Sequence, residues 1–298
     1  MTYSIVARDE ETGCLGVAVQ SGVLAVGPRV AAALPGVGAV AVQAGSELTW
    51  RTMLLDLLAS GLGATEAVAA LTTVPGAAES QFAAVDATGA TAVHTGPDCL
   101  AHAGHARAGA VSAQGNTLAS ERVWPAMIDA YAAADGPLAE RLVAALAAAE
   151  SEGGDVRGPQ SAALLVVGPV PGSQATGYPD DPVVDLRVDD SRTPVADLAR
   201  LLTTARAHRH LIRAGMTGEL DELRRAVAIA PEDPAALRAA GIRLWLGGHA
   251  GEAEPLLARA IAVEPAVRRW AEVSAAASDS PHAATLLAWL DHPRVGTT

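Results

Sequence analysis

The sequence predicts an α+β sandwich followed by a small all-helical part. Strand patterns come first along the chain, helical pairs follow, and strands then return, unlike the regular strand–helix alternation of a parallel sheet. Residues from about 217 onward contain only helical patterns and an internal repeat. The chain is 50% hydrophobic but only 3% aromatic, so its core is expected to consist of Ala, Val and Leu.

The chain opens with a predicted β-hairpin. Residues 3–8 form the first strand, residues 9–13 the turn, and residues 15–20 the second strand. The apolar run at 161–167 is typical of a buried strand. Further strands are predicted at residues 36–43, 81–85, 90–94 and 183–188.

Helical patterns occur in pairs that are separated by glycines. Gly61 and Gly63 interrupt the first pair, and Asp135-Gly136 interrupts the second. Helix pairs placed between groups of strands favour a layered α+β fold. The predicted helices span residues 47–60, 65–73, 121–134, 137–150 and 195–208.

The C-terminal part carries a repeat. Arg225–Pro231 (RAVAIAP) aligns with Arg259–Pro265 (RAIAVEP), 34 residues later, which is the period of tetratricopeptide repeats. We therefore expect a sandwich domain at residues 1–212 and a tetratricopeptide-like helical domain at 213–298. Because one full repeat is fewer than the three usually needed for stability, the tail is expected to pack on the first domain or on a second copy.

Composition narrows the functions to consider. The chain has no Lys, which excludes a catalytic or Schiff-base lysine. Its formal net charge is −12, and this excess lies before residue 206, so nucleic acid is not an expected partner. Acidic residues at 9–11 argue against a signal peptide, and no long apolar run suggests a membrane span. We expect a cytoplasmic protein without a cofactor.

Thr2 becomes the first residue when Met1 is removed, which is usual before a small second residue. Its α-amine, with an ordinary pKa of about 7.7–8.0, is then a base beside its own hydroxyl nucleophile. A predicted strand follows at once and would hold this nucleophile rigidly. A Met-Thr start alone is common and does not indicate catalysis.

Several segments, spread over residues 2–205, together resemble a known family. They are Thr2–Gly27 (TYSIVARDEETGCLGVAVQSGVLAVG), Gly36–Gln43 (GVGAVAVQ), Val111–Asn116 (VSAQGN), Gly153–Leu165 (GGDVRGPQSAALL) and Val184–Asp190 (VDLRVDD). Their content and order resemble the family catalogued as domain of unknown function 1028. The resemblance implies a four-layer αββα sandwich of the N-terminal-nucleophile hydrolase type, with Thr2 at the nucleophile position. It leaves the activity open, because a shared fold does not settle chemistry.

The glycine-rich loop at 153–161 holds further candidate residues. Asp155 would orient the terminal amine, and Arg157 offers a two-pronged match to a substrate carboxylate. Gln160 and Ser161 lead into a predicted buried strand and would point into the site. The alternative is an Asp–Arg pair that only holds a turn.

Polar side chains near strand ends complete the candidate site. Gln114 and Asn116 flank Gly115 and carry the amide groups that an oxyanion hole uses. Gln43 and Ser21 end two other strands and would face the substrate. For each of them, a hydrogen bond that satisfies a strand end is the alternative.

Other chemistries find less support in the sequence. His94, Cys99, His102 and His105 match no established zinc spacing, so we interpret them as loop packing and expect no metal. The chain also lacks a P-loop and a Gly-x-Ser-x-Gly elbow, which argues against nucleotide hydrolysis and a lipase-like triad.

The expected function is hydrolysis of a C–N bond of amide type in a small, anionic molecule. Thr2 would attack the carbonyl carbon, its own amine would move the proton, and Arg157 would hold the anionic end. The rival hypothesis is a non-catalytic protein. In that case the sandwich binds a small molecule, and the tail binds a protein partner or a second copy.

Overall fold

The computed structural model describes residues 2–45, 49–170 and 183–291, and residue contacts divide the chain into two compact units. The first unit extends to Leu202 and the second begins at Thr203, within helix α6 (Pro194–Thr217). The boundary expected after residue 212 falls in the same helix. A mixed α+β unit is thus followed by a helical unit, as the sequence predicts at this level.

Within the described residues, the larger sheet of the first unit has six antiparallel strands. Their order is β10-β9-β2-β1-β8-β7, so β1 lies between β2 and β8. The predicted hairpin is confirmed, with Tyr3 paired to Gln20 and Arg8 paired to Leu15. The strands are β1 (Thr2–Arg8), β2 (Leu15–Ser21), β7 (Gly104–Ala108), β8 (Val111–Asn116), β9 (Ser161–Val167) and β10 (Val184–Val188).

The second sheet has the order β3-β4-β5-β6 in the described part of the chain, and all its pairs are antiparallel. Strands β3 and β7 are not among the predicted strands, because neither has the β-branched or aromatic side chains that are typical of strands. The strands of this second sheet are β3 (Ala31–Leu34), β4 (Gly38–Gln43), β5 (Gln81–Asp86) and β6 (Thr91–Thr95). The short helix α1 (Gly27–Val30) precedes β3, and the short 3₁₀ helix η1 (Ala77–Glu79) precedes β5.

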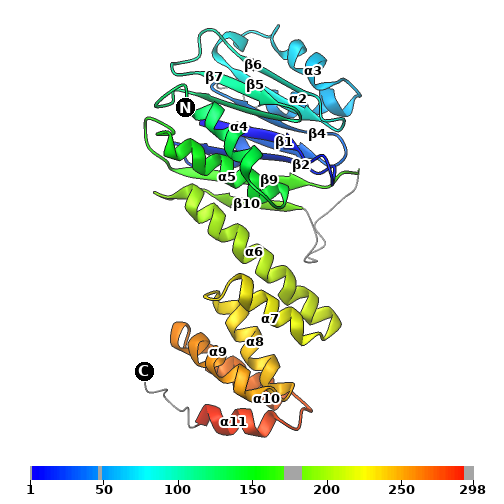
Figure 1. Ribbon diagram of the computed structural model, residues 1–298, viewed down its shortest axis with the longest axis vertical. Helices are drawn as coiled ribbons and strands as arrows, with labels where there is room; N and C mark the ends of the chain where they lie inside the picture. Colours follow the sequence, from blue (N-terminus) through cyan, green and yellow to red (C-terminus); the bar gives the residue numbers. More distant parts are fainter. Residues whose placement is uncertain (1, 46–48, 171–182, 292–298) are drawn as a thin grey trace. The chain divides into compact units, whose positions relative to one another are not determined.

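Helices cover the outer face of each sheet (Figure 1). On the larger sheet, α4 (Val123–Ala133) packs on β7 and β8, and α5 (Leu138–Ser151) packs on β1, β2 and β9. On the second sheet, α2 (Thr49–Ala59) and α3 (Ala64–Leu71) pack on β3 to β6. The first two residues of the helix predicted at 47–60 lie outside the described residues.

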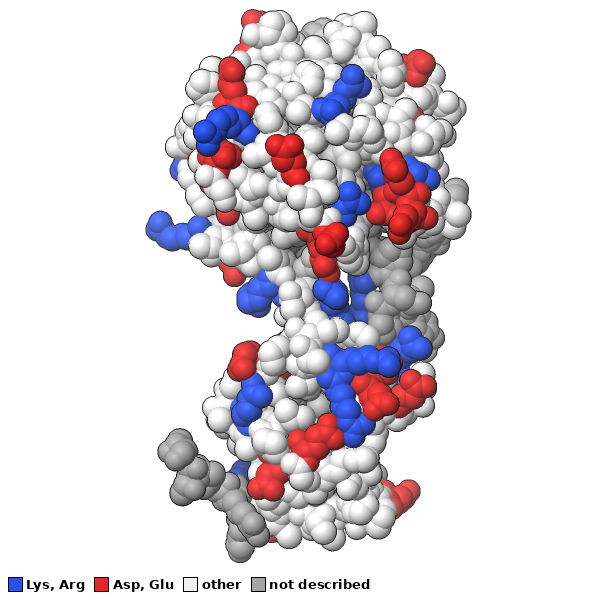
Figure 2. Space-filling view, viewed as in Figure 1, with Lys and Arg blue, Asp and Glu red and all other residues white. Residues whose placement is uncertain are grey.

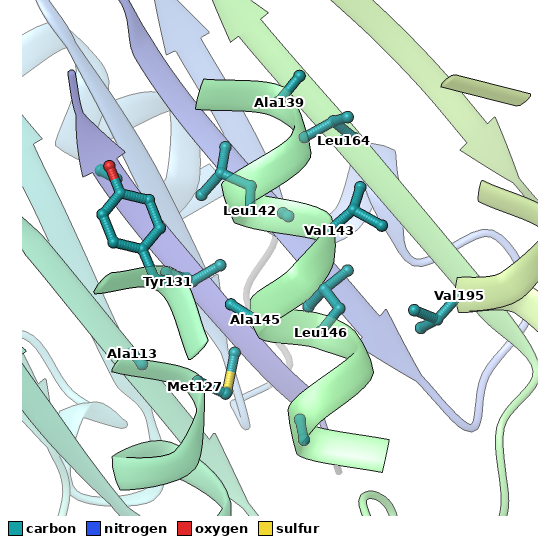
Figure 3. Packing of buried hydrophobic residues seen from close by; sticks show 14 of the residues in the cluster. Ala113, Met127, Tyr131, Ala139, Leu142, Val143, Ala145, Leu146, Leu164 and Val195 are labelled. Atoms are coloured by element: carbon teal, nitrogen blue, oxygen red, sulfur yellow. The ribbon is translucent and has the colours of Figure 1, made fainter. Parts of the chain in front are cut away.

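Alternation along β1 divides its side chains between two cores. Ile5 belongs to the cluster beneath α4 and α5, where it is buried together with Leu142 and Leu146 of α5 (Figure 3). Val6 points the other way and belongs to the cluster between the two sheets, with Ala39 and Ala83 of the second sheet. Burying each large aliphatic side chain contributes about 1.5–3 kcal/mol. Thr2 and Ser4 share the inward face with Val6, so β1 carries polar groups between the sheets at its start.

The second unit continues from α6 through five further helices in the described residues. Asp233 caps α8 by accepting a hydrogen bond from the Ala236 N–H, and Pro234 opens that helix. Gly241 of α8 meets α9 closely, because a Cβ there would lie 2.9 Å from the backbone nitrogen of Leu257. The helices are α7 (Leu220–Ile229), α8 (Pro234–Leu246), α9 (Ala250–Val263), α10 (Ala266–Ala276) and α11 (Ala283–Asp291).

Acidic and basic side chains are interspersed on the face shown in Figure 2, with no continuous basic patch there. In the helical unit Arg224 pairs with Asp221 at 2.6 Å and with Glu252 at 2.8 Å. Among the described helices, none combines the length and apolar character needed to cross a bilayer.

Candidate active site

Amide side chains from two other strands hold the carbonyl of Thr2. Gln43 Nε2 donates to this oxygen at 3.1 Å, and Asn116 Nδ2 donates to it at 3.4 Å. Both amides also donate to Gln81 Oε1, at 2.9 and 3.0 Å. Gln81 in turn donates to the Gly115 carbonyl at 2.8 Å. The start of β1 is therefore tied to β8 in its own sheet and to β4 and β5 in the other.

Ser4 forms a second polar link between the sheets. Its hydroxyl donates to Gln43 Oε1 at 2.7 Å, and Gln114 Nε2 donates to Ser4 Oγ at 2.6 Å. Ser112 Oγ completes the chain by donating to Gln114 Oε1 at 3.1 Å. Because these buried groups satisfy one another, the network fixes a single arrangement of the two sheets. The Gln114 amide thus contacts Ser4 and Ser112, not the Thr2 hydroxyl.

The Thr2 hydroxyl faces a charge pair through one intervening serine. Thr2 Oγ1 lies 3.0 Å from Ser21 Oγ, and Arg157 Nη2 donates to Ser21 Oγ at 3.3 Å. Arg157 also donates to both carboxylate oxygens of Asp155, at 3.2 and 3.0 Å. Burial alone raises the pKa of the Asp155 carboxyl, but hydrogen bonds from Arg157 and from the Gly22 N–H outweigh it and hold that pKa below its usual range.

The charge pair depends on a close approach of two loops. The Gly22 N–H donates to Asp155 Oδ2 at 2.7 Å. A Cβ at Gly22 would lie 2.6 Å from the Gly158 carbonyl oxygen, so a larger residue cannot sit there without moving backbone. Gly158 itself has a φ of +89°, in the left-handed region. The glycines of both loops therefore place Asp155 and Arg157 beside Ser21.

A family model described as "Family of unknown function (DUF1028)" matches residues 2–198, which include every residue of this cluster. The chain belongs to the DUF1028 family. The crystal structure of a Silicibacter pomeroyi protein of the same family is 34% identical, with a TM-score of 0.61, and the match covers 68% of this chain and 88% of that one. No curated protein matches the chain.

Two other predicted residues of this DUF1028 member bond to its loops. Ser161 Oγ donates to the Val23 carbonyl at 2.6 Å and accepts from the Val26 N–H at 3.0 Å. Gln160 Nε2 donates to Asp190 Oδ1 at 3.1 Å. Both side chains therefore bond to loop groups and not to Thr2. Thr2, Ser21, Asp155 and Arg157, in contrast, form one connected cluster.

Three residues that position this cluster are not among the predicted site residues: Ser4, Gly22 and Gln81. Ser4 follows Thr2 by two residues, so strand alternation alone could have placed both on one face. Gln81 opens a predicted strand, but its role depends on pairing opposite Gln43, which is a long-range register. Position 22 requires a glycine because the Gly158 carbonyl lies against it, and one sequence alone does not reveal such a contact.

Buried polar atoms also lie on the side of the larger sheet that faces α4 and α5. Within the described residues, the Tyr3 hydroxyl and Gln20 Oε1 have no hydrogen-bond partner, and the same holds for one carboxylate oxygen of Glu150. Burial and the nearby charges of Glu150 and Asp155 raise the pKa of Tyr3 well above its ordinary value. Tyr3 therefore stays neutral at any physiological pH.

A cavity of about 540 Å³ in the first unit lies at the other end of β1. Its lining includes Asp9, Tyr131 and Arg141, and none of the candidate site residues. The Arg141 guanidinium lies 4.0 Å from the Tyr131 ring centroid and 3.6 Å from Asp9, so these three lining side chains contact one another.

The three histidines and the cysteine that were compared with zinc motifs in the sequence make separate contacts. His94 Nε2 lies 3.0 Å from the Ala77 carbonyl, and His105 Nδ1 lies 2.9 Å from Thr95 Oγ1. Burial raises the pKa of the Cys99 thiol, which disfavours the reactive thiolate. In the part of the chain that is described, no group of three or more His, Cys, Asp or Glu residues is arranged to hold a metal ion.

Proposed function

We propose that this protein is an N-terminal-nucleophile hydrolase that cleaves an amide-type C–N bond of a small molecule. Thr2 is the nucleophile once Met1, which lies outside the described residues, has been removed. The observation that carries the proposal is the contact of the Thr2 hydroxyl with Ser21, 3.0 Å away, beside the Asp155–Arg157 pair. Two face-to-face antiparallel sheets with helices on both outer faces agree with the four-layer αββα sandwich of that class.

The chemistry starts from a residue that carries both base and nucleophile. Removal of Met1 leaves a free amine on Thr2, which takes the hydroxyl proton as Oγ1 attacks the substrate carbonyl carbon. The amine then returns the proton to the leaving nitrogen as the C–N bond breaks, and an ester to Thr2 remains. Water cleaves this ester by the same route, which releases a carboxylic acid and restores the hydroxyl.

The surrounding side chains have distinct tasks in this proposal. The Gln114 and Asn116 amides already bond to Ser4, Gln81 and the Thr2 carbonyl, so we assign them to positioning β1. Backbone N–H groups then stabilise the oxyanion. Arg157, whose side chain is 34% exposed, attracts the anionic end of the substrate, and Asp155 holds the guanidinium in place.

The first test is the state of the N-terminus. Intact-mass measurement on protein from its native host is expected to show a chain without Met1. Periodate cleaves a free 2-amino alcohol, so in the unfolded chain it is expected to convert an N-terminal Thr2 to an aldehyde, whereas a chain that retains Met1 yields no such aldehyde. Retention of Met1 in the native product would exclude the mechanism.

The second test is turnover. A panel of small carboxylate-bearing amides, assayed by amine release, is expected to yield a substrate for which Thr2→Ala loses activity by at least about 10³-fold. Thr2→Ser is expected to keep part of it. Thr65→Ala, an exposed threonine on α3, is the matched control and is expected to keep full activity. Full activity in Thr2→Ala would exclude Thr2 as the nucleophile. Absence of turnover with every amide of the panel would instead favour the rival function, a binding protein that uses its helical unit for association.

A further inference from the structure

A cavity that the candidate active site does not use lies at the opposite end of β1 from Thr2. It measures about 540 Å³, and we call it the Tyr131 cavity. Three turns contribute to its lining, at residues 9–11 between β1 and β2, 108–110 between β7 and β8, and 134–136 between α4 and α5. Its volume lies within the range of about 300–1,000 Å³ that is typical of small-molecule sites. The cavity is therefore a candidate binding site in its own right.

The turn between β1 and β2 is held in one conformation. Thr12 donates two hydrogen bonds to Asp9 Oδ1, from its backbone N–H and from its hydroxyl, both at 2.8 Å. The other carboxylate oxygen of Asp9 lies 3.6 Å from Arg141 Nη1, which ties the turn to α5. One wall of the cavity is thus preformed, and it carries Glu10 and Glu11.

The hydroxyl of Tyr131 is a polar group without a partner at this cavity. Tyr131 is only 4% exposed and lines the cavity, and its hydroxyl forms no hydrogen bond within the described residues. The hydroxyl lies at the end of the ring that points away from Met127 (Figure 3). Burial raises the pKa of the phenol to about 12, so the hydroxyl stays neutral and offers both a proton and a lone pair. Because an unpaired polar group in a buried side chain costs free energy, it favours a ligand that bonds to it.

Three carboxylates at the rim of the cavity are unpaired. Glu10, Glu11 and Asp135 line it, are exposed, and form no ion pair in the part of the chain that is described. Glu10 Oε1 lies 3.9 Å from the position that a Cβ would have at Gly109, so this carboxylate reaches the turn between β7 and β8. No three acidic groups among the described residues are arranged to hold a metal ion. These carboxylates therefore suit separate positive groups of one larger ligand.

The two guanidinium groups of the lining do not offset these charges. Arg141 is already paired with Asp9 and lies over the ring of Tyr131. Arg8 lies on the inward face of β1, away from α4 and α5, and its Nη2 atom lies 3.4 Å from the position of a Cβ at Gly13. Its guanidinium is therefore turned toward the space between the sheets. The cavity presents a net negative charge to a ligand.

Apolar side chains form much of the remaining wall. They come from α4 and from the hairpin of β7 and β8, and they include Ile128, Ala132, Ala108, Ala110 and Val111. Such a wall favours methylene groups, because their burial removes apolar area from water. The cavity therefore combines dispersed negative charge with an apolar surface.

We propose that the Tyr131 cavity binds a linear alkyl polyamine, which is a chain of methylene groups that carries two or more ammonium groups. One ammonium group bonds to Glu10 and Glu11, another bonds to Asp135, and the methylene chain packs on Ile128. An ammonium N–H donates to the Tyr131 hydroxyl, which thereby gains a partner. Hydrogen bonds from a charged donor to a carboxylate are stronger than neutral ones. This site is separate from the candidate active site, so the proposal does not depend on hydrolase activity.

Titration calorimetry of the full chain with spermidine at low ionic strength tests the role of the carboxylates. Saturable binding is expected, and the double variant Glu10→Gln/Asp135→Asn is expected to raise the Kd at least about tenfold. The matched control is Asp56→Asn/Glu66→Gln, which removes two exposed carboxylates from α2 and α3 on the other sheet. It is expected to change the Kd by less than about twofold, because charges that do not touch the ligand are largely screened.

Circular dichroism checks that both double variants are folded. Absence of saturable binding would overturn the proposal. An equal loss of affinity in the two double variants would also overturn it, because spermidine would then respond only to the overall charge of the chain.

Removal of the Tyr131 hydroxyl alone tests the proposed hydrogen bond. Tyr131→Phe is expected to raise the Kd for spermidine about three- to tenfold. Urea unfolding without spermidine is expected to change little, since this hydroxyl bonds to nothing in the described residues. n-Butylamine, which has a single ammonium group, is expected to bind at least about tenfold more weakly than spermidine. Wild-type affinity in Tyr131→Phe, or equal affinity for the two amines, would contradict the proposed site.

Discussion

Ser21 lies between the Thr2 hydroxyl and the Arg157 guanidinium, at 3.0 Å from the first and 3.3 Å from the second. A hydroxyl can accept from the guanidinium and still share a proton with Thr2. Asp155, whose side chain is fully buried, pairs with Arg157 and holds its guanidinium beside Ser21. At the residue scale, the site therefore depends on keeping Asp155 ionised.

Replacing this carboxylate is expected to reduce stability in a pH-dependent way. At pH 7, Asp155→Asn is expected to lower the free energy of unfolding by about 2 kcal/mol, because it leaves Arg157 without its counter-ion. The pKa of Asp155 is lowered in the folded chain, so its contribution is present above the unfolded pKa of about 3.9 and is lost as pH falls through the folded value.

Urea unfolding at several pH values checks this expectation. The gap between wild type and Asp155→Asn is expected to be constant between neutral pH and about pH 5, and to shrink below about pH 4. Asp129→Asn on the exposed side of α4 is the control, with a change within about 0.5 kcal/mol. A gap that does not change with pH would show that the Asp155 charge is not the stabilising feature.

At the element scale, local sequence patterns predicted most strands and helices. They failed for features that depend on pairing between distant segments of the chain. The β1–β2 hairpin is confirmed because Asp9–Gly13 is a strong turn between apolar runs. No local pattern marks β3, whose four residues are three alanines and a leucine, because only its pairing with β4 makes it a strand. The same limit hid Gln81, since its partners come from β4 and β8.

The tight contact between α8 and α9 is open to a direct test. Gly241→Ala is expected to destabilise the helical unit by about 1–2 kcal/mol, because the new methyl would lie 2.9 Å from Leu257 backbone and side-chain atoms. Gly251→Ala in α9 meets nothing within 4 Å and is expected to stabilise the unit by up to about 1 kcal/mol. Urea unfolding measures both. Equal effects would mean that helix propensity, not the α8–α9 contact, determines stability.

On the scale of the whole molecule, the two units have separate cores and separate buried charges. In the helical unit Glu222 is 1% exposed and lies 2.6 Å from His210 Nδ1, with Arg225 and Arg213 nearby. The hydrogen bond from His210, aided by the two guanidinium groups, lowers the pKa of Glu222. Asp155 has a similar role in the first unit, because it is a buried carboxylate that Arg157 keeps ionised.

These two carboxylates allow the cooperativity of the whole chain to be measured. If the units unfold independently, calorimetry of the full chain is expected to show two transitions, of which Asp155→Asn lowers one midpoint and Glu222→Gln the other. Loss of the Glu222 charge is expected to cost about 3 kcal/mol and to lower its midpoint by roughly 10 °C or more. Glu264→Gln, an exposed change in the helical unit, is expected to move neither. A single transition that both variants shift would show that α6, which continues from one unit into the other, couples them into one cooperative structure.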